Sequence, residues 1–460
     1  MARSSRQSTF IQLREQFPFF VFEKQEYWLT SRGLEIRFTF NLADKYQFYP
    51  SIFIPRNSFF RPDEEITNHI ENIIFNLGMI ELISYWKATC SPMLVIKPFA
   101  LHPEQVSWWK KLYFHGLGEF FYLNNLDVTE DSFMEVKVAS QVILSAENFE
   151  FDEGIIIPVG GGKDSAVTLE LSGSRPGSLP LIMNPRGASL ETIAAKGFSM
   201  EQFIEIRRTI DPTLLKLNEL GFLNGHTPFS ALLAFVTALS AIVTGRRHIA
   251  LSNESSASEA TIEGTDINHQ YSKSLKFESD FRDYIKRWIS EDINYFSLLR
   301  PLNELQIASF FSRFPKYHQV FKSCNVASKT NSWCGCCAKC LFTFIILSPF
   351  LDEEHLVVIF GKNLLADASL MLLFDQLTGV AEEKPFDCVG TIREVNLALC
   401  EVIRHNVDKE LPVLLNYYRN SQSFYKYSQF DFASELFQVS SEHYLLPEFK
   451  ILIEDWVKKM

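Results

Sequence analysis

The sequence has 460 residues, of which 47% are hydrophobic, and it carries a net charge of −11 at neutral pH. The length predicts about three domains, and the hydrophobic content is sufficient for large cores. The acidic balance argues against a protein that binds nucleic acid, because contact with a phosphate backbone needs a basic face. We therefore expect no nucleic-acid partner.

Targeting and membrane-spanning segments are not expected either. The apolar stretch 17–22 is too short for a secretion signal, and charged residues follow it directly. The longest apolar run, 229–244, lies between Pro228 and Gly245 and is shorter than a membrane span, so it predicts a buried helix. We expect a cytoplasmic protein without a membrane partner, in which the eight cysteines are reduced.

Residues 1–150 predict an N-terminal α+β domain, which we expect to contain an antiparallel sheet with helices. Trp108 and Trp109 lie in one of its predicted helices and are interpreted as packing residues. We find no chemical motif in this part of the chain. The strands are predicted at 34–40, 47–55 and 91–97, and the helices after Pro62 and at 103–114.

The next stretch carries the strongest functional pattern of the chain. An apolar strand at 154–159 is followed by three glycines and then by the start of a helix. Glycines let the backbone approach a bound group closely, and a helix N-terminus presents unpaired N–H groups, so the pattern is typical of a phosphate site. The loop consists of Gly160, Gly161, Gly162, Lys163, Asp164 and Ser165.

Two common phosphate-binding motifs do not fit this loop. The Walker A motif requires a glycine where Ile157 stands and a Ser or Thr where Asp164 stands, and the dinucleotide fingerprint requires a glycine at Ser165. The loop instead resembles the pyrophosphate loop (PP-loop) of ATP pyrophosphatases, Ser-Gly-Gly-x-Asp-Ser, with Gly160 in place of the first serine. This resemblance implies that residues 160–165 hold ATP and that Asp164 helps to place Mg²⁺. The alternative is a glycine turn that only packs a helix on a sheet.

Strand and helix patterns alternate over residues 151–350, which predicts a nucleotide-binding domain with a doubly wound parallel sheet. Such sheets bind ligands outside the carboxyl ends of their strands, where this sequence places three polar loops. Each asparagine in these loops is by itself also typical of a simple turn. The strands are predicted at 154–159, 179–184 and 248–253. The loops add three nucleotide-binding candidates: Asn184, Asn253 and Glu254.

A polar segment at 260–274 has neither helix nor strand periodicity and is predicted to be a surface loop. His269, Tyr271 and Lys273 in this segment are candidates for acid–base or phosphate contacts. The alternative is a solvated loop without a chemical role.

Five of the eight cysteines lie between residues 324 and 340, which favours metal binding over disulfides. Four thiolates at this spacing suit tetrahedral Zn²⁺ in a closed, structural site. The pattern resembles the zinc knot of the 7-cyano-7-deazaguanine synthases, which are PP-loop enzymes, and it leaves Cys336 out. The alternative is a group of reduced cysteines beside the apolar helix 341–351. The expected zinc ligands are Cys324, Cys334, Cys337 and Cys340.

Residues 351–460 predict a mainly helical C-terminal region. An extended segment, 384–391, lies immediately before a helix start and contains Cys388. A helix N-terminus lowers the pKa of a nearby thiol, which makes Cys388 a candidate for acid–base chemistry. The simpler interpretation of the segment is that Asp387 or Thr391 caps the helix.

Several motifs taken together resemble one family, the UDP-N-acetylmuramoyl-L-alanyl-L-glutamate epimerases of bacterial cell-wall synthesis. The resemblance covers residues from about 75 to 400 and includes the segment 81–90. One departure is that two adjacent cysteines, Cys336 and Cys337, stand between Gly335 and Lys339, where the family pattern has a single cysteine. The other motifs are Val-Gly-Gly-Gly-Lys-Asp-Ser, Ser-Asn-Glu-Ser-Ser-Ala, Asn-His-Gln-Tyr-Ser-Lys-Ser, Trp-Cys-Gly-x-Cys-x-Lys-Cys and Lys-Pro-Phe-x-Cys-Val-Gly-Thr.

The resemblance implies an enzyme that uses ATP and Mg²⁺ to invert the terminal L-glutamate of UDP-MurNAc-L-Ala-L-Glu to D-glutamate. A companion muramyl ligase first attaches the L-glutamate. Transfer of AMP to the carboxylate makes the α proton acidic, and a base and an acid on opposite faces then exchange it. The acid–base candidates are His269, Lys273 and Cys388, with Asp164 as the Mg²⁺ residue. Alternatives are another PP-loop ligase or amidating enzyme, a tRNA-modifying relative, and a protein that binds ATP without splitting it.

Overall fold

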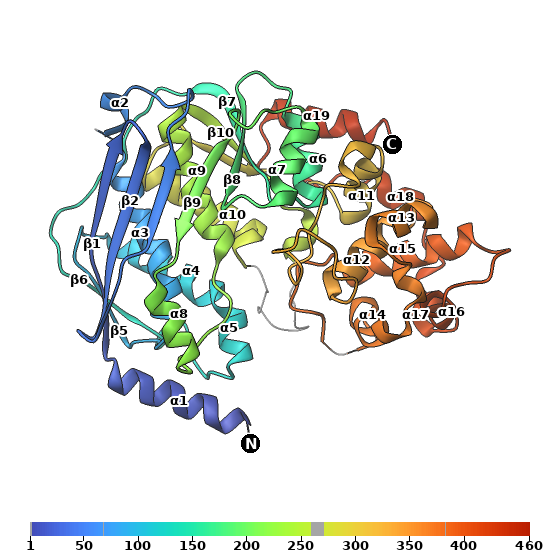
Figure 1. Cartoon of the computed structure of the whole chain (residues 1–460), viewed down its shortest axis with the longest axis horizontal. Helices are drawn as coiled ribbons and strands as arrows, with labels where there is room; N and C mark the ends of the chain where they lie inside the picture. Colours follow the sequence, from blue (N-terminus) through green and yellow to red (C-terminus); the bar gives the residue numbers. More distant parts are fainter. Residues whose placement is uncertain (1, 68, 259–270, 382) are drawn as a thin grey trace. The chain divides into compact units, whose positions relative to one another are not determined.

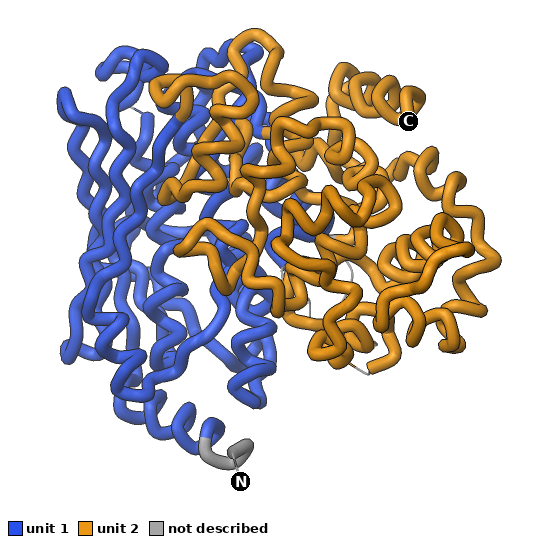
Figure 2. Tube along the Cα trace, turned by 45° about the vertical axis from the view of Figure 1, so that its right-hand side comes forward, with its two compact units in different colours: residues 1–156, 204–249, 270–295 blue, residues 157–203, 250–269, 296–460 orange. Residues whose placement is uncertain are grey.

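The computed structural model describes residues 2–67, 69–258, 271–381 and 383–460 (Figure 1). The architecture is α/β, with a mixed multi-strand sheet and many helices, which confirms the α/β class, whereas the doubly wound parallel sheet of a PP-loop domain stays a prediction. The chain forms two compact units, each assembled from three separate segments (Figure 2). Unit 1 comprises residues 1–156, 204–249 and 270–295, and unit 2 comprises residues 157–203, 250–269 and 296–460.

Unit 1 contains most of the strands. Those that lie wholly within it are β1 (Phe19–Thr30), β2 (Gly33–Leu42), β3 (Tyr46–Phe48), β4 (Ser51–Pro55), β5 (Met93–Ile96), β6 (Glu135–Val138) and β9 (Ile204–Thr209). Three further strands contribute residues to both units: β7 (Asp152–Pro158), β10 (Arg246–Leu251) and β11 (Asn294–Ser297).

The strands of unit 1 pair in both directions. β1 pairs antiparallel with β2, β2 with β3 and β4, and β4 with β9. β5 runs parallel to β1, β6 runs parallel to β5, and β10 runs parallel to β7. The prediction of an antiparallel N-terminal sheet is therefore wrong in part. A helix connects β4 to β5, and such a crossover lets the next strand start from the same end of the sheet.

That connecting helix, α3 (Glu71–Trp86), forms the centre of the core of unit 1. Apolar residues occur on all its sides, and every residue after Glu71 is buried, as expected for a helix without a polar face. It contacts β1, β2 and α9 (Phe229–Thr244), and the ring of Phe22 stacks on that of Phe75 at 5.9 Å.

The other helices of unit 1 lie before, between and after these elements. Trp109 is fully buried, and its indole N–H donates to the Tyr284 hydroxyl at 3.0 Å, which confirms its interpretation as a packing residue. The helices are α1 (Ala2–Gln16), α2 (Asp63–Thr67), α4 (Pro103–Gly116), α5 (Gly118–Leu123), α8 (Pro212–Glu219), the 3₁₀ turn η2 (Tyr271–Lys273) and α10 (Leu275–Trp288).

Unit 2 combines the chain after β7 with the C-terminal part of the protein. Its first elements are α6 (Lys163–Ser172), β8 (Ser178–Met183), α7 (Gly187–Lys196) and the 3₁₀ turn η1 (Ser255–Ser258). From residue 301 onward the described residues form helices, turns and loops without a strand, as predicted for the C-terminal region. These helices are α11 (Glu304–Ser312), η3 (Pro315–Tyr317), α12 (Ala338–Leu347), α13 (Glu353–Phe360), η4 (Leu364–Ala366), η5 (Ala368–Leu370), α14 (Met371–Thr378), α15 (Ile392–His405), α16 (Val413–Arg419), α17 (Gln422–Tyr427), α18 (Phe432–Phe437) and α19 (Pro447–Val457).

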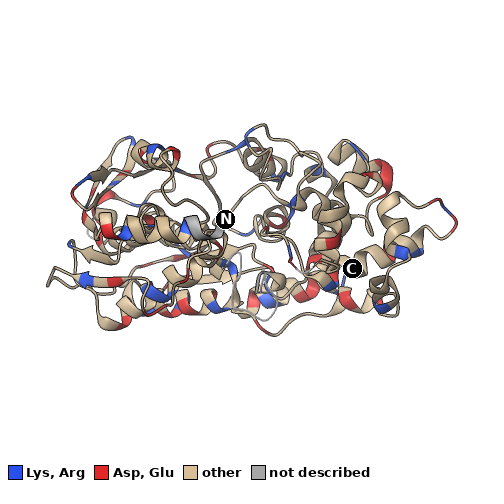
Figure 3. Ribbon diagram, turned by 90° about the horizontal axis from the view of Figure 1, so that it is seen from below, with Lys and Arg blue, Asp and Glu red and all other residues tan. Residues whose placement is uncertain are grey.

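Charged residues of both signs are interspersed along the ribbon (Figure 3). The buried apolar helix predicted at 229–244 is α9, and it ends at Gly245, whose φ of +71° is the left-handed conformation typical of a helix C-terminus. Of the helices that the structure describes, none has the length and apolarity needed to cross a membrane.

Candidate active site

The glycine loop lies in unit 2, between the end of β7 and the start of α6, as the sequence predicts. We call residues 160–165 the phosphate loop. Gly161 has a φ of +90°, and a Cβ there would lie 2.7 Å from backbone atoms of Ala188 and Ser189, so only glycine fits. Gly160 is exposed, and no described atom lies within 4 Å of the position of its missing Cβ. The backbone at Gly160 is therefore open to a ligand.

Ser165 and the backbone of Lys322 hold the phosphate loop in shape. The Ser165 Oγ accepts the N–H of Gly161 at 3.1 Å and donates to the carbonyl of Gly162 at 3.0 Å. On the other side, the N–H of Lys322 donates to the carbonyl of Gly161 at 2.8 Å. No described side chain caps α6 at Gly162, so its N-terminus keeps the dipole and amides that favour an anion.

Lys163 is turned into the protein. It is 4% exposed, and its ammonium forms ion pairs with the carboxylates of Asp164 and Glu304. Burial alone would lower the pKa of Lys163, but the two carboxylates outweigh burial and the pKa is raised, so the lysine stays charged. The Asp164 side chain is 34% exposed and only its Oδ1 meets the lysine, which leaves its other oxygen available in the described structure.

Two buried glutamates behind Lys163 were not found from the sequence. Glu304 begins α11 and is 4% exposed, and Glu394 lies in the first turn of α15 and is 6% exposed. Glu394 accepts the N–H of Glu304 at 2.8 Å and, through its other oxygen, the N–H and Oγ of Thr391 at 2.6 and 2.7 Å. The capping pattern Thr-x-x-Glu is readable in the sequence, but the contact with Glu304 is tertiary and has no local signal.

Burial raises the pKa of Glu304 well above its usual value. Lys163 opposes this shift, whereas the carboxylates of Asp164, Glu254 and Glu394 reinforce it. Burial also raises the pKa of Glu394, although its hydrogen bonds from Glu304 and Thr391 lower it in part. Four carboxylates thus influence one another in one part of unit 2, and like charges at close range favour the retention of protons.

The three residues predicted from the loops at the strand ends differ in their surroundings. Glu254 belongs to the acidic group, and its carbonyl accepts from the buried Arg300 at 2.6 Å. The side-chain amide of Asn253 donates to the Ser297 Oγ at 3.0 Å, which holds the loop that contains Asn253. Asn184 is exposed and has a φ of +49°, as in many asparagine turns.

The three acid–base candidates come from different parts of the chain. His269 lies outside the described residues. Lys273 ends η2, which belongs to unit 1, and Tyr271 in the same turn is buried. Cys388 lies in unit 2 with the phosphate loop and is half-buried. These assignments stay predictions.

The four cysteines predicted to bind zinc lie together. Sγ–Sγ distances are 3.9 Å for Cys324–Cys337, 3.7 Å for Cys334–Cys340 and 3.5 Å for Cys337–Cys340, and all four sulfurs lie within 4.8 Å of one another. Zn–S bonds of about 2.3 Å in a tetrahedron place the sulfurs about 3.8 Å apart, so the group fits Zn²⁺. Cys336 is exposed and lies outside the group. In the described part of the chain, no carboxylates or histidines form a comparable group.

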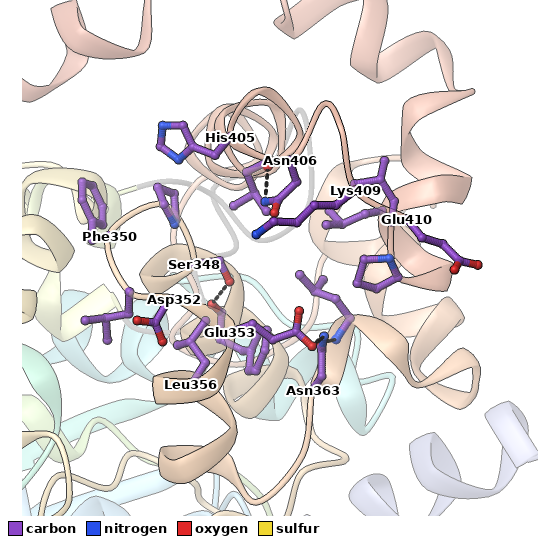
Figure 4. Close-up of a pocket in the computed structure, with 18 residues that line it drawn as sticks. Ser348, Phe350, Asp352, Glu353, Leu356, Asn363, His405, Asn406, Lys409 and Glu410 are labelled. Carbon is purple, nitrogen blue, oxygen red and sulfur yellow. Dashed lines mark hydrogen bonds between the residues drawn. The ribbon is translucent and has the colours of Figure 1, made fainter.

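A cavity of about 340 Å³ lies among the C-terminal helices of unit 2 (Figure 4). Phe344 of α12, Leu356 of α13 and His405 of α15 contribute to its walls, and Lys409 and Glu410 lie at one side. Neither the phosphate loop nor Glu304 nor Glu394 lines it. The cavity is therefore separate from the candidate active site.

Comparison with known proteins identifies two family domains in the chain. The MurL N-terminal domain matches residues 12–298, and this match ends just after residue 295, where the last segment of unit 1 ends. The MurL C-terminal domain matches residues 320–429. No solved structure is significantly similar.

Three curated proteins, each named UDP-N-acetyl-alpha-D-muramoyl-L-alanyl-L-glutamate epimerase, are similar over most of their length. The protein from Xanthomonas oryzae pv. oryzae is 35% identical over 354 residues, which is 75% of this chain and 78% of that protein. The protein from Salinispora tropica is 34% identical over 363 residues, with 77% and 78% covered, and that from a Micromonospora species is 33% identical over 362 residues, with 77% and 79% covered.

Proposed function

The chain belongs to the MurL family of glutamate epimerases, and on this premise we propose that it inverts the terminal glutamate of UDP-MurNAc-L-Ala-L-Glu from L to D. The names of its relatives support this substrate and this reaction. The substrate would come from a muramyl ligase that adds L-glutamate. A peptidoglycan precursor is then the product.

The chemistry of the substrate explains why a phosphate loop belongs in an epimerase. An ionised carboxylate makes its α C–H a very weak acid, because deprotonation would place a second negative charge beside the first. Transfer of AMP from ATP removes the carboxylate charge and leaves a carbonyl that can hold charge as an enolate. We therefore propose that ATP and Mg²⁺ are used, that pyrophosphate is released when AMP is transferred, and that water then hydrolyses the acyl–phosphate bond to release AMP and restore the carboxylate.

The open Gly160 backbone and the uncapped N-terminus of α6 are the observation that carries this proposal. In the proposed PP-loop domain, these backbone groups bind the phosphates of ATP. The free oxygen of Asp164 is suited to Mg²⁺, which usually takes one or two protein carboxylates together with phosphate oxygens. Lys163 neutralises the buried carboxylates and does not contact the open side of the loop.

The acid–base pair must act on opposite faces of the α carbon. Of the candidates whose positions the structure describes, Cys388 lies in the same unit as the phosphate loop, on a segment that leads into the N-terminus of α15. His269 and Lys273 remain candidates for the opposite face. In the same proposal, Zn²⁺ held by Cys324, Cys334, Cys337 and Cys340 has a structural role.

The proposed function is tested by incubating the protein with UDP-MurNAc-L-Ala-L-Glu, ATP and Mg²⁺ in deuterated water. We expect D-glutamate in the product, deuterium at its α carbon, and release of AMP and pyrophosphate. Asp164→Asn should abolish all three, and omission of ATP should prevent deuterium uptake. Formation of ADP would contradict the PP-loop assignment, and ATP-independent deuterium uptake would contradict the proposed activation of the carboxylate.

A further inference from the structure

A continuous set of buried contacts leads from the phosphate loop to the start of α15. Lys163 pairs with the carboxylate of Glu304, and the N–H of Glu304 donates to Glu394 at 2.8 Å. Glu394 in turn accepts both the N–H and the Oγ of Thr391. Three helices are joined in this way, because Lys163 begins α6, Glu304 begins α11 and Glu394 lies in α15.

Gly390 shows how closely this set of contacts meets the segment before α15. We call residues 384–391 the Cys388 segment. A Cβ at Gly390 would lie 2.9 Å from the Cγ of Glu304 and 2.9 Å from the Oε2 of Glu394, so the segment packs directly on both glutamates. The same Cβ would lie 3.0 Å from the ring of Phe342 in α12. Little space is therefore left for the segment to shift toward the glutamates.

The Cys388 segment is also held near the cysteine group. The carboxylate of Asp387 accepts from the side-chain amide of Asn325 at 2.9 Å, and Asn325 follows Cys324 directly. Cys388 therefore lies between two fixed points, one at Asp387 and one at Gly390 and Thr391. A cap that served only α15 would need Thr391 and Glu394 alone. Here Glu394 also accepts the N–H of Glu304, whose carboxylate pairs with Lys163.

We propose that Glu304 and Glu394 are positioning residues that join the phosphate loop to the Cys388 segment, so that the two are placed as one rigid assembly. The inference rests on the proposed function, which gives the phosphate loop and Cys388 their chemical roles. Both glutamates act through other residues. Glu304 orients Lys163 and with it Asp164, and Glu394 fixes the backbone that follows Cys388.

The test measures each substitution at the opposite end of the assembly: at Cys388 for Glu304, whose carboxylate pairs with Lys163, and at the nucleotide site for Glu394, which caps α15. Glu304→Gln removes the negative charge that Glu304 presents to Lys163 but keeps the size of the side chain. In this variant the labelling rate of Cys388 by iodoacetamide is measured without ATP, by peptide mass spectrometry. Glu394→Gln places an NH₂ group against N–H donors, and the binding of Mg²⁺ and ATP is measured by calorimetry. We expect Cys388 labelling to rise several-fold in the first variant and nucleotide affinity to fall several-fold in the second.

Three comparisons separate this role from loss of stability. Cys336 is exposed and outside the assembly, so its labelling rate should stay unchanged in every variant. Glu401→Gln lies on the same helix as Glu394 and breaks an ion pair with Arg404 at 3.0 Å, yet should leave both measurements at wild-type values. Gly390→Ala keeps both charges and should reproduce the two effects by pushing the glutamates apart.

The outcomes distinguish this inference from the proposed function. If Glu304→Gln and Gly390→Ala lower the melting temperature but leave Cys388 labelling unchanged, the glutamates are only structural and the inference is wrong. If the wild-type protein binds no ATP, the proposed function fails, while the labelling of Cys388 in the Glu304 variant still decides whether the two segments are joined.

Discussion

Lys163 is a buried cation whose partner Glu304 is also buried, and this determines what the removal of Lys163 will cost. The side chains of Lys163 and Glu304 are each 5% exposed. Removing one partner of a buried ion pair leaves the other charge without compensation, which costs about 3–5 kcal/mol. Lys163→Met should therefore lower the free energy of unfolding by that amount in urea denaturation near neutral pH.

The loss in Lys163→Met should depend on pH. Without the lysine, burial and the neighbouring carboxylates of Asp164, Glu254 and Glu394 all raise the pKa of Glu304. A carboxyl whose pKa is raised in the folded protein loses its stabilising contribution as the pH rises, so the defect should shrink in mild acid. Lys450→Met, at an exposed ion pair, should cost less than about 1 kcal/mol at any pH. Equal losses in the two variants would contradict the buried-pair account.

Lys87 is a second buried lysine, and among the residues that the structure describes it has no carboxylate partner. It is 7% exposed, and its ammonium donates to the carbonyl of Gly225. Burial, with a smaller effect of Arg208, lowers its pKa to about 8. Between this value and the ordinary lysine value the unfolded chain binds more protons than the folded one, so stability should rise with pH over this range.

Comparison with Lys87→Met isolates this effect. Relative to that variant, the wild-type protein should gain about 2 kcal/mol in unfolding free energy between about pH 7.5 and about pH 10. The exposed Lys216 in unit 1 provides the control, because Lys216→Met should not change the pH profile. A profile that is the same with and without Lys87 would show that the lysine is solvated in solution.

At the scale of single elements, the cysteine group gives the clearest prediction. Two half-buried thiols and two buried ones at tetrahedral spacing should bind about one equivalent of zinc per chain, measured by elemental analysis. Cys337→Ala should then lower the melting temperature sharply, because the binding energy of a structural metal is folding energy. Cys336→Ala should have little effect. A metal-free wild-type protein whose stability is unchanged by chelators would support the interpretation as plain reduced cysteines.

Elements with a strong local pattern could be predicted from the sequence. The strand before the glycines, the apolar run of α9 and the start of α15 after Thr391 all lie close to their predicted positions. The strand candidate at 47–55 is divided into β3 and β4, and the long strand β1 was not predicted. The pattern in β1 is irregular because a bulge between Phe22 and Lys24 interrupts its alternation.

The candidate site could be predicted only where its residues are close in sequence. Gly160 to Ser165 and the four cysteines form local patterns, and their side chains or backbones lie together as expected. Glu304 and Glu394 join the site through contacts across long sequence separations, with Lys163 and with each other. A single sequence carries no signal for such pairs, because each glutamate by itself is typical of the first turn of any helix.

At the scale of the whole molecule, the chain alternates between the two units. The division into domains at 1–150, 151–350 and 351–460 stays a prediction. Unit 1 nevertheless takes β9 and α9 from residues 204–249 and α10 from residues 270–295. A fragment that ends at 150 therefore lacks elements that complete the core around α3.

We expect a fragment of residues 1–150 to remain unfolded. It leaves α3 without α9 and β4 without β9. The fully buried carboxylate of Glu81 would lose Arg208, which donates to it at 2.8 Å. Burying an unpaired charge costs several kcal/mol, which is comparable to the whole stability of a small domain.

A fragment of residues 1–295 supplies all three segments of unit 1 and provides the comparison. It should show protected amides in β1 and β2 by hydrogen exchange, whereas the shorter fragment should exchange at the rate of an unstructured chain. Glu81→Gln in the longer fragment should reduce this protection, because Arg208 is then buried without a countercharge. Cooperative thermal unfolding of the 1–150 fragment would show instead that β1, β2 and α3 form a core that needs neither α9 nor β9.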